Sequence, residues 1–124
     1  SFNNAIKIKP KDGIPAHHIS IENCVIHSCK GAGIRMESDV HHVRIFNCLI
    51  YNNGQQYDGE NDGLGGISTQ YDGKVHHVTI TNCTLIMNGS RSLHLSIGGP
   101  DVVVKNSVIF QPERGNKQYF PVGL

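Results

Sequence analysis

The stretch "HHVRIFNC", from His41 to Cys48, decides the fold. Its apolar residues Val43 and Ile45 occupy alternate positions, which is the pattern of a half-buried β-strand. After Asn47 the alternation shifts by one residue, so we expect a tight bend there. Asparagine is the non-glycine residue that best tolerates a left-handed backbone. The stretch therefore predicts a strand, a bend at the asparagine, and a second short strand.

The same pattern recurs along the chain. It appears as "HHISIENC" from His17, as "HHVTITNC" from His76, and in degraded form as "DVVVKNSVIF" from Asp101. The bend asparagines stand at positions 23, 47, 82 and 106, in steps of 24, 35 and 24 residues. The middle step is one period plus 11 further residues. A fixed period of this size indicates a repeat architecture.

A second kind of strand lies between these units. Each example carries apolar or small residues at alternate positions, and turns rich in Gly or Asn-Gly precede the last three. The examples are residues 5–9, 33–37, 66–70 and 92–96. Three short strands in each period of about 24 residues describe one coil of a solenoid.

The segment "HHVTITNCTLIMNGSRSLHLS", residues 76–96, resembles the repeats of right-handed parallel β-helix proteins of the pectate-lyase-like superfamily. The resemblance covers nearly all of residues 2–110. It implies an all-β, right-handed parallel β-helix solenoid of about four coils with three short strands each. It also implies an asparagine ladder at the bends, a cysteine ladder beside it, and a secreted, periplasmic or cell-surface location.

A chain of 124 residues is long enough for a single domain. We expect repeat coils over residues 2–110 and an irregular segment over residues 111–124. Solenoids expose apolar ends unless the ends are capped. We therefore expect either a fragment of a longer protein or self-association through uncapped coil ends.

The repeated histidines and cysteines suggest metal ligands, but their register favours a structural interpretation. Adjacent imidazole columns could bind a transition metal, yet a ladder presents its ligands in parallel. We therefore predict that the histidines stack. Cys24, Cys48 and Cys83 should form a buried, unreactive column with Ser107 and no disulfide. Cys29 lies outside this column and is the candidate for a reactive thiol, with its redox state left open.

The composition limits the classes of partner. The formal net charge is +1, so the chain as a whole offers no basic surface for nucleic acid. No stretch approaches the length of a membrane span, and we expect no membrane partner. The motifs of pectin hydrolases, alginate epimerases, serine hydrolases and P-loop enzymes do not occur.

The candidate site lies on the outward positions of the first strand of each coil. The resemblance implies that an acidic polysaccharide lies along this face, where Lys and Arg would neutralise sugar carboxylates. A basic residue there could also remove the proton next to the carboxylate-bearing carbon. The alternative is an ordinary solvated sheet face. The catalytic candidates are Arg35, His94 and Lys7, and the substrate-binding candidates are Lys9, Glu37, Ser68, Gln70 and Tyr57.

The 11-residue insertion lies within residues 51–66, before the first strand of the third coil, and should overhang the same face. Its side chains Asp58, Glu60 and Asp62 offer hard oxygen ligands for Ca²⁺. The segment begins like an EF-hand loop, but the twelfth position is Thr69 rather than Glu, so we reject that motif. The alternative is a flexible acidic loop.

Two functions remain open on this basis. The first is a polysaccharide-active domain, lyase-like on acidic glycans, with hydrolase and epimerase chemistry as further options. The second is a non-catalytic glycan-binding, adhesin or structural repeat domain. The residues that carry the resemblance are scaffold residues, so the resemblance does not choose between these functions.

Overall fold

The computed structural model describes residues 4–54, 65–69, 74–89, 91–95, 101–110 and 122–123. Their regular structure consists of strands. These residues contain no helix long and apolar enough to cross a membrane.

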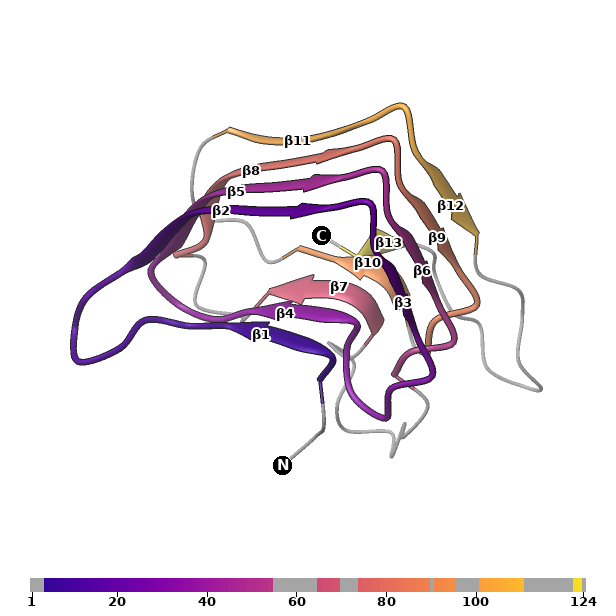
Figure 1. The fold of residues 1–124 in the computed structure, drawn as a ribbon, viewed down its shortest axis with the longest axis horizontal. Coiled ribbons are helices and arrows are strands. Elements are labelled where there is room, and N and C mark those ends of the chain that lie inside the picture. The colour runs from indigo at the N-terminus through magenta and orange to yellow at the C-terminus, as the bar shows by residue number, and fades with distance from the viewer. Residues whose placement is uncertain are drawn as a thin grey trace.

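Three parallel sheets wind the chain into successive coils (Figure 1). Sheet one contains β1 (Ile6–Ile8), β4 (Ile34–Met36), β7 (Gly65–Thr69), β10 (Arg91–His94) and β13 (Val122–Gly123). Sheet two contains β2 (Ala16–Glu22), β5 (Val40–Phe46), β8 (His76–Thr81) and β11 (Val102–Lys105). Sheet three contains β3 (Val25–His27), β6 (Leu49–Tyr51), β9 (Thr84–Ile86) and β12 (Val108–Phe110). The predicted parallel solenoid of about four three-strand coils is confirmed.

Equivalent residues of successive repeats are paired on adjacent strands of each sheet. Ile45 on β5 aligns with Ile21 on β2 and Ile80 on β8, and Val43 aligns with Val78. All five side chains are buried, and the inward positions of the three sheets form one apolar core. The alternation seen in "HHVRIFNC" therefore reports which residues face the core.

The asparagine bends are confirmed as well. Asn23, Asn47, Asn82 and Asn106 have φ angles of 57°, 54°, 54° and 50°. The Nδ2 of Asn47 donates to the Oδ1 of Asn23 at 2.8 Å, and Asn106 donates in the same way to Asn82. The left-handed conformation turns the chain from sheet two into sheet three, and the amides bond from coil to coil.

A second, buried ladder lies at the end of the third sheet and was not predicted. Asn53 and Asn88 are fully buried, and their amides bond to each other at 3.1 Å. Asn53 also accepts the backbone N–H of Cys29, so Cys29 stands at the start of this column. Positions 29, 53 and 88 repeat the steps of 24 and 35 residues. The Asn-Gly pairs at 53–54 and 88–89 were the available signal.

The segment expected to be irregular, residues 111–124, requires one correction. Val122–Gly123 form β13, which pairs in parallel with β10 and adds a fifth strand to sheet one. Val122 aligns with Leu93 and Gly123 with His94, so the strand register of this sheet continues. The rest of that segment lies outside the described residues.

Candidate functional site

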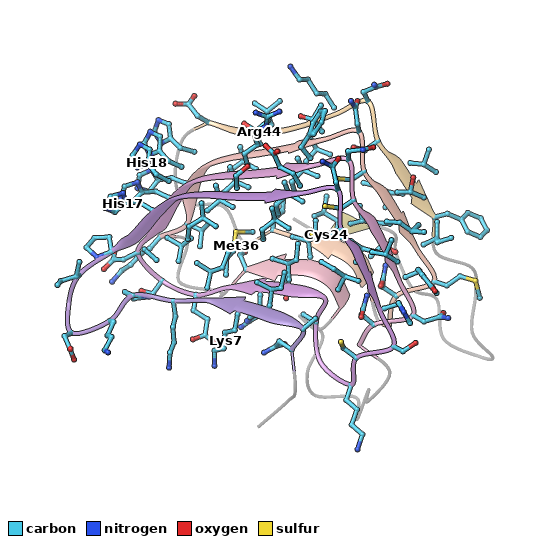
Figure 2. The ribbon with its side chains drawn as sticks, in the orientation of Figure 1. Lys7, His17, His18, Cys24, Met36 and Arg44 are labelled. Carbon is cyan, nitrogen blue, oxygen red and sulfur yellow. The ribbon has the colours of Figure 1, made fainter. Side chains whose placement is uncertain are left out.

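The predicted first-strand column of sheet one is in register. Lys7 aligns with Arg35, Arg35 with Ser68, and Ser68 with His94 on adjacent parallel strands. Figure 2 shows Lys7 directed away from the coil interior, and Met36 directed into it. We call Lys7, Lys9, Arg35, Glu37 and Ser68 the sheet-one face.

Two exposed or half-exposed charges on this face are paired. The Nζ of Lys7 lies 3.2 Å from Oε1 of Glu37, with side-chain exposures of 44% and 27%. Glu37 is held at the end of β4 because its backbone N–H donates to the carbonyl of Ile8. The ion pair is open to water, so its contribution to stability is small. Lys9 is exposed on the same side.

Arg35 is the most constrained cation on the face. Its Nη1 donates to the hydroxyl of Ser68 at 3.4 Å and to the carbonyl of Thr69 at 3.2 Å. Ser68 is 0% exposed. In this structure Ser68 therefore positions the guanidinium of Arg35 and offers no surface of its own to a ligand. Arg35 remains half-buried and keeps further N–H donors.

The cysteine column is confirmed, with one correction: Cys24, at the first coil, is half-buried rather than buried, because no earlier coil covers it. The four cysteines are free thiols, and Cys48 and Cys83 are buried. Ser107 continues the column, since its Oγ accepts the backbone N–H of Cys83 at 3.1 Å. Burial raises the pKa of the Cys48 thiol, which disfavours the reactive thiolate.

Cys48 is therefore expected to resist alkylation in the folded protein. Iodoacetamide at mildly alkaline pH should modify the half-buried Cys24 and Cys29 well before Cys48, because access and ionisation are both limited there. Peptide mass spectrometry over time measures the order. Equal rates at all the thiols in the native state would contradict the buried column.

The histidines form two stacked columns, as predicted, and the ring planes of one column are nearly perpendicular to those of the other. We call His17, His18, His41, His42, His76 and His77 the imidazole array. Rings within a column stack with centroids 4.5–5.1 Å apart and planes within 10° of parallel. Rings within a pair meet nearly at right angles, at 76–85°.

The orientation of the rings does not suit a metal ion shared along one column. The stacked rings are within 10° of parallel, so their nitrogen lone pairs lie in parallel planes and do not converge on one ion. The residues that the structure describes contain no group of three or more His, Cys, Asp or Glu side chains arranged to hold a metal.

A hollow on the outer face of sheet two was not predicted. It has a volume of about 330 Å³, and its lining includes His42, Arg44, His77, Thr79 and Asp101. Arg44 lies 3.6 Å from Glu22 and stacks over the ring of Phe46 at 4.7 Å. The outward parity of Arg44 in "HHVRIFNC" was a sufficient signal for its position. The hollow itself was not predictable, because β5, β8 and Asp101 come together only when successive coils stack.

A family model of the right handed beta helix region matches residues 2–119. The match spans β1 to β12 of the three parallel sheets, with their bends. The chain belongs to the right-handed β-helix family. No curated protein and no solved structure matches it.

Family membership establishes the fold class of this β-helix. Its chemistry has to be inferred from the residues of the candidate site. Several predicted site residues lie outside the described residues, namely Tyr57, Asp58, Glu60, Asp62 and Gln70. The backbone of His94 is described within β10, and its side chain is not. The structure therefore brings together Lys7, Arg35, Glu37 and Ser68, with Lys9 beside them.

Proposed function

We propose that this β-helix domain binds an acidic polysaccharide along the sheet-one face. The register of Lys7 and Arg35 is the observation that carries the proposal. Aligned residues on adjacent parallel strands are about 4.8 Å apart, so the two cations lie side by side across the sheet. Lys9, which directly follows β1, is exposed and adds a third cation to this face.

The charge balance of the face favours an anionic chain. Its described residues carry three cations and one carboxylate, Glu37, which already pairs with Lys7. The hydrogen bonds to Ser68 and Thr69 hold the Arg35 guanidinium in place. A positioned guanidinium loses less freedom when it binds a sugar carboxylate, and its free N–H groups suit that planar acceptor.

Lyase-like chemistry on the same glycan is the second candidate. It requires a cation to neutralise the carboxylate and a base to take the neighbouring proton. Arg35 suits the first role, because a guanidinium stays protonated. His94 follows Ser68 in the register and is the proposed base. We also keep Asp58, Glu60 and Asp62 as a proposed Ca²⁺ site.

Removing the cations is expected to weaken binding to an acidic glycan. The double variant Lys9→Gln, Arg35→Gln should bind polygalacturonate roughly tenfold or more weakly, because two charge-assisted contacts are lost. Calorimetry or affinity electrophoresis at low and high salt measures this loss. Binding by the unmodified chain should also weaken as salt rises.

The matched control is Lys105→Gln on β11, which removes one exposed cation from sheet two. It should bind almost as the unmodified chain does, and a neutral glucan should bind weakly to all variants. Equal affinity of the double variant and the control would contradict the proposal. Unsaturated uronate products that disappear in His94→Ala would establish the lyase reading, and adding Ca²⁺ or a chelator tests the proposed ion.

A further inference from the structure

The imidazole array depends on a repeated left-handed backbone. His18, His42 and His77 have φ angles of 56°, 54° and 52°. Successive side chains in a regular strand point to opposite faces, but this kink turns both rings of each pair to the same side. Figure 2 shows His17 and His18 together on the outside of the coil, where β2 begins. A left-handed histidine is strained, and three coils repeat it.

Each pair is closed by one short contact between ring nitrogens. The Nδ1 atoms are 2.7 Å apart in His17–His18, 2.8 Å in His41–His42 and 2.7 Å in His76–His77. One nitrogen must donate and the other must accept, so a single proton lies between the rings. Two N–H groups pointing at each other across this distance would place their hydrogens less than about 1 Å apart.

We propose that the imidazole array is an acid-sensitive element of the fold, in which each histidine pair holds one proton between its rings and opens when a second proton is forced into that position. A neutral pair carries two protons on four nitrogens, and a singly charged pair carries three, with the hydrogen bond intact. The fourth proton converts both Nδ1 atoms to donors and breaks the contact.

Stacking makes even the first charges unfavourable. The rings of neighbouring coils lie 4.5–5.1 Å apart, so imidazolium ions in one column repel each other. The central pair has neighbours on both sides. Partial desolvation, followed by the charges of the neighbouring imidazoles, lowers the pKa of both His41 and His42.

Few opposite charges face the array to offset this repulsion. Within the described ranges, Asp101 is the carboxylate that contacts it, with Oδ2 lying 3.0 Å from Nε2 of His77. Arg44 lines the same hollow, and Glu22 is directed to Arg44. The unfolded chain separates the rings, so His41 and His42 take up protons more readily there than in the array.

The direction of the pH effect follows from the lowered pKa values of the central pair. Above the ordinary histidine pKa of about 6.5, the central pair is neutral in both the folded and the unfolded state, and its hydrogen bond is intact. As the pH falls below that value, the unfolded chain binds protons first, and stability decreases until the lowered folded pKa values are passed. The array therefore weakens the corner between sheets one and two in mild acid.

The test compares the loss of stability in acid between the unmodified chain and a triple variant. His18→Asn, His42→Asn and His77→Asn remove one ring from each pair, and asparagine tolerates the left-handed backbone. The midpoint of unfolding of the unmodified chain should decrease when the pH is lowered from about 7.5 to about 5. The triple variant should lose less than half as much over the same range.

The control His27→Asn removes an exposed histidine that stacks on Tyr51, outside the array. It should keep the full acid sensitivity of the unmodified chain. Equal acid loss in the triple variant and the control would overturn the proposal.

Nitrogen-15 spectra of the unmodified chain test the shared proton even if the triple variant fails to fold. At neutral pH, each pair should show one Nδ1–H ring and one Nε2–H ring. Six rings in the Nε2–H form would overturn the proposal, because no proton would then lie between the Nδ1 atoms.

Discussion

Asn53→Ala is expected to lower the free energy of unfolding by about 3–5 kcal/mol. The side chain is fully buried, and its Nδ2 donates to the carbonyl of Ile26 and to Oδ1 of Asn88, both at 3.1 Å. Its Oδ1 accepts the backbone N–H of Cys29 at 3.2 Å. Each buried group left without a partner costs roughly 1–3 kcal/mol. Chemical denaturation with constant m-value measures the loss.

The control for Asn53→Ala is Asn47→Gly in the outer ladder. Asn47 is exposed and donates to Asn23 at 2.8 Å, and glycine keeps the left-handed backbone that this position needs. Water can replace the lost bond, so the expected loss is about 1 kcal/mol. Equal losses in the two variants would mean that burial does not distinguish the two ladders.

Ile50→Ala should have an effect of similar size, a loss of about 2–5 kcal/mol. Ile50 is 0% exposed at the centre of β6, and it aligns with Ile26 on β3 and Leu85 on β9. Its truncation leaves a cavity between the side chains of Ile26 and Leu85. The coils that enclose the cavity are held in register by the sheets, which limits their collapse. Thermal or urea unfolding measures the change.

The neighbouring residue supplies a matched control. Leu49 precedes Ile50 on the same strand and points outward, with 36% of its surface exposed. Leu49→Ala should cost less than about 1 kcal/mol, since little apolar surface returns to water. A larger loss at Leu49 than at Ile50 would show that the parity assigned to β6 is wrong.

Much of the fold was predictable because each coil repeats a local rule. Val43 and Ile45 alternate with outward residues, the chain bends at Asn47, and the buried Cys48 directly precedes the next strand, β6. Parallel coils then align equivalent residues, so one correct register predicted the columns of Cys, Asn and His.

The sequence did not predict the features that depend on contacts between side chains of different strands and turns. Ser68 occupies an outward position by parity, yet it is buried and bonded to Arg35. Asn53 and Asn88 bond to each other where both are buried. The Asn-Gly pairs in the sequence do not show this burial, since an exposed turn has the same pair. The hollow beside Arg44 joins residues from three coils.

The sequence by itself determined the period, the strand parity and the bends, because alternation and backbone preference are local properties of the chain. Only the tertiary structure decided how the histidines of "HHVRIFNC" meet. The left-handed kink at His42 and the stacking of neighbouring coils bring ring nitrogens within a hydrogen bond of each other. That contact depends on the backbone conformation at His42 together with the spacing of the coils. The order of residues in the chain specifies neither of these.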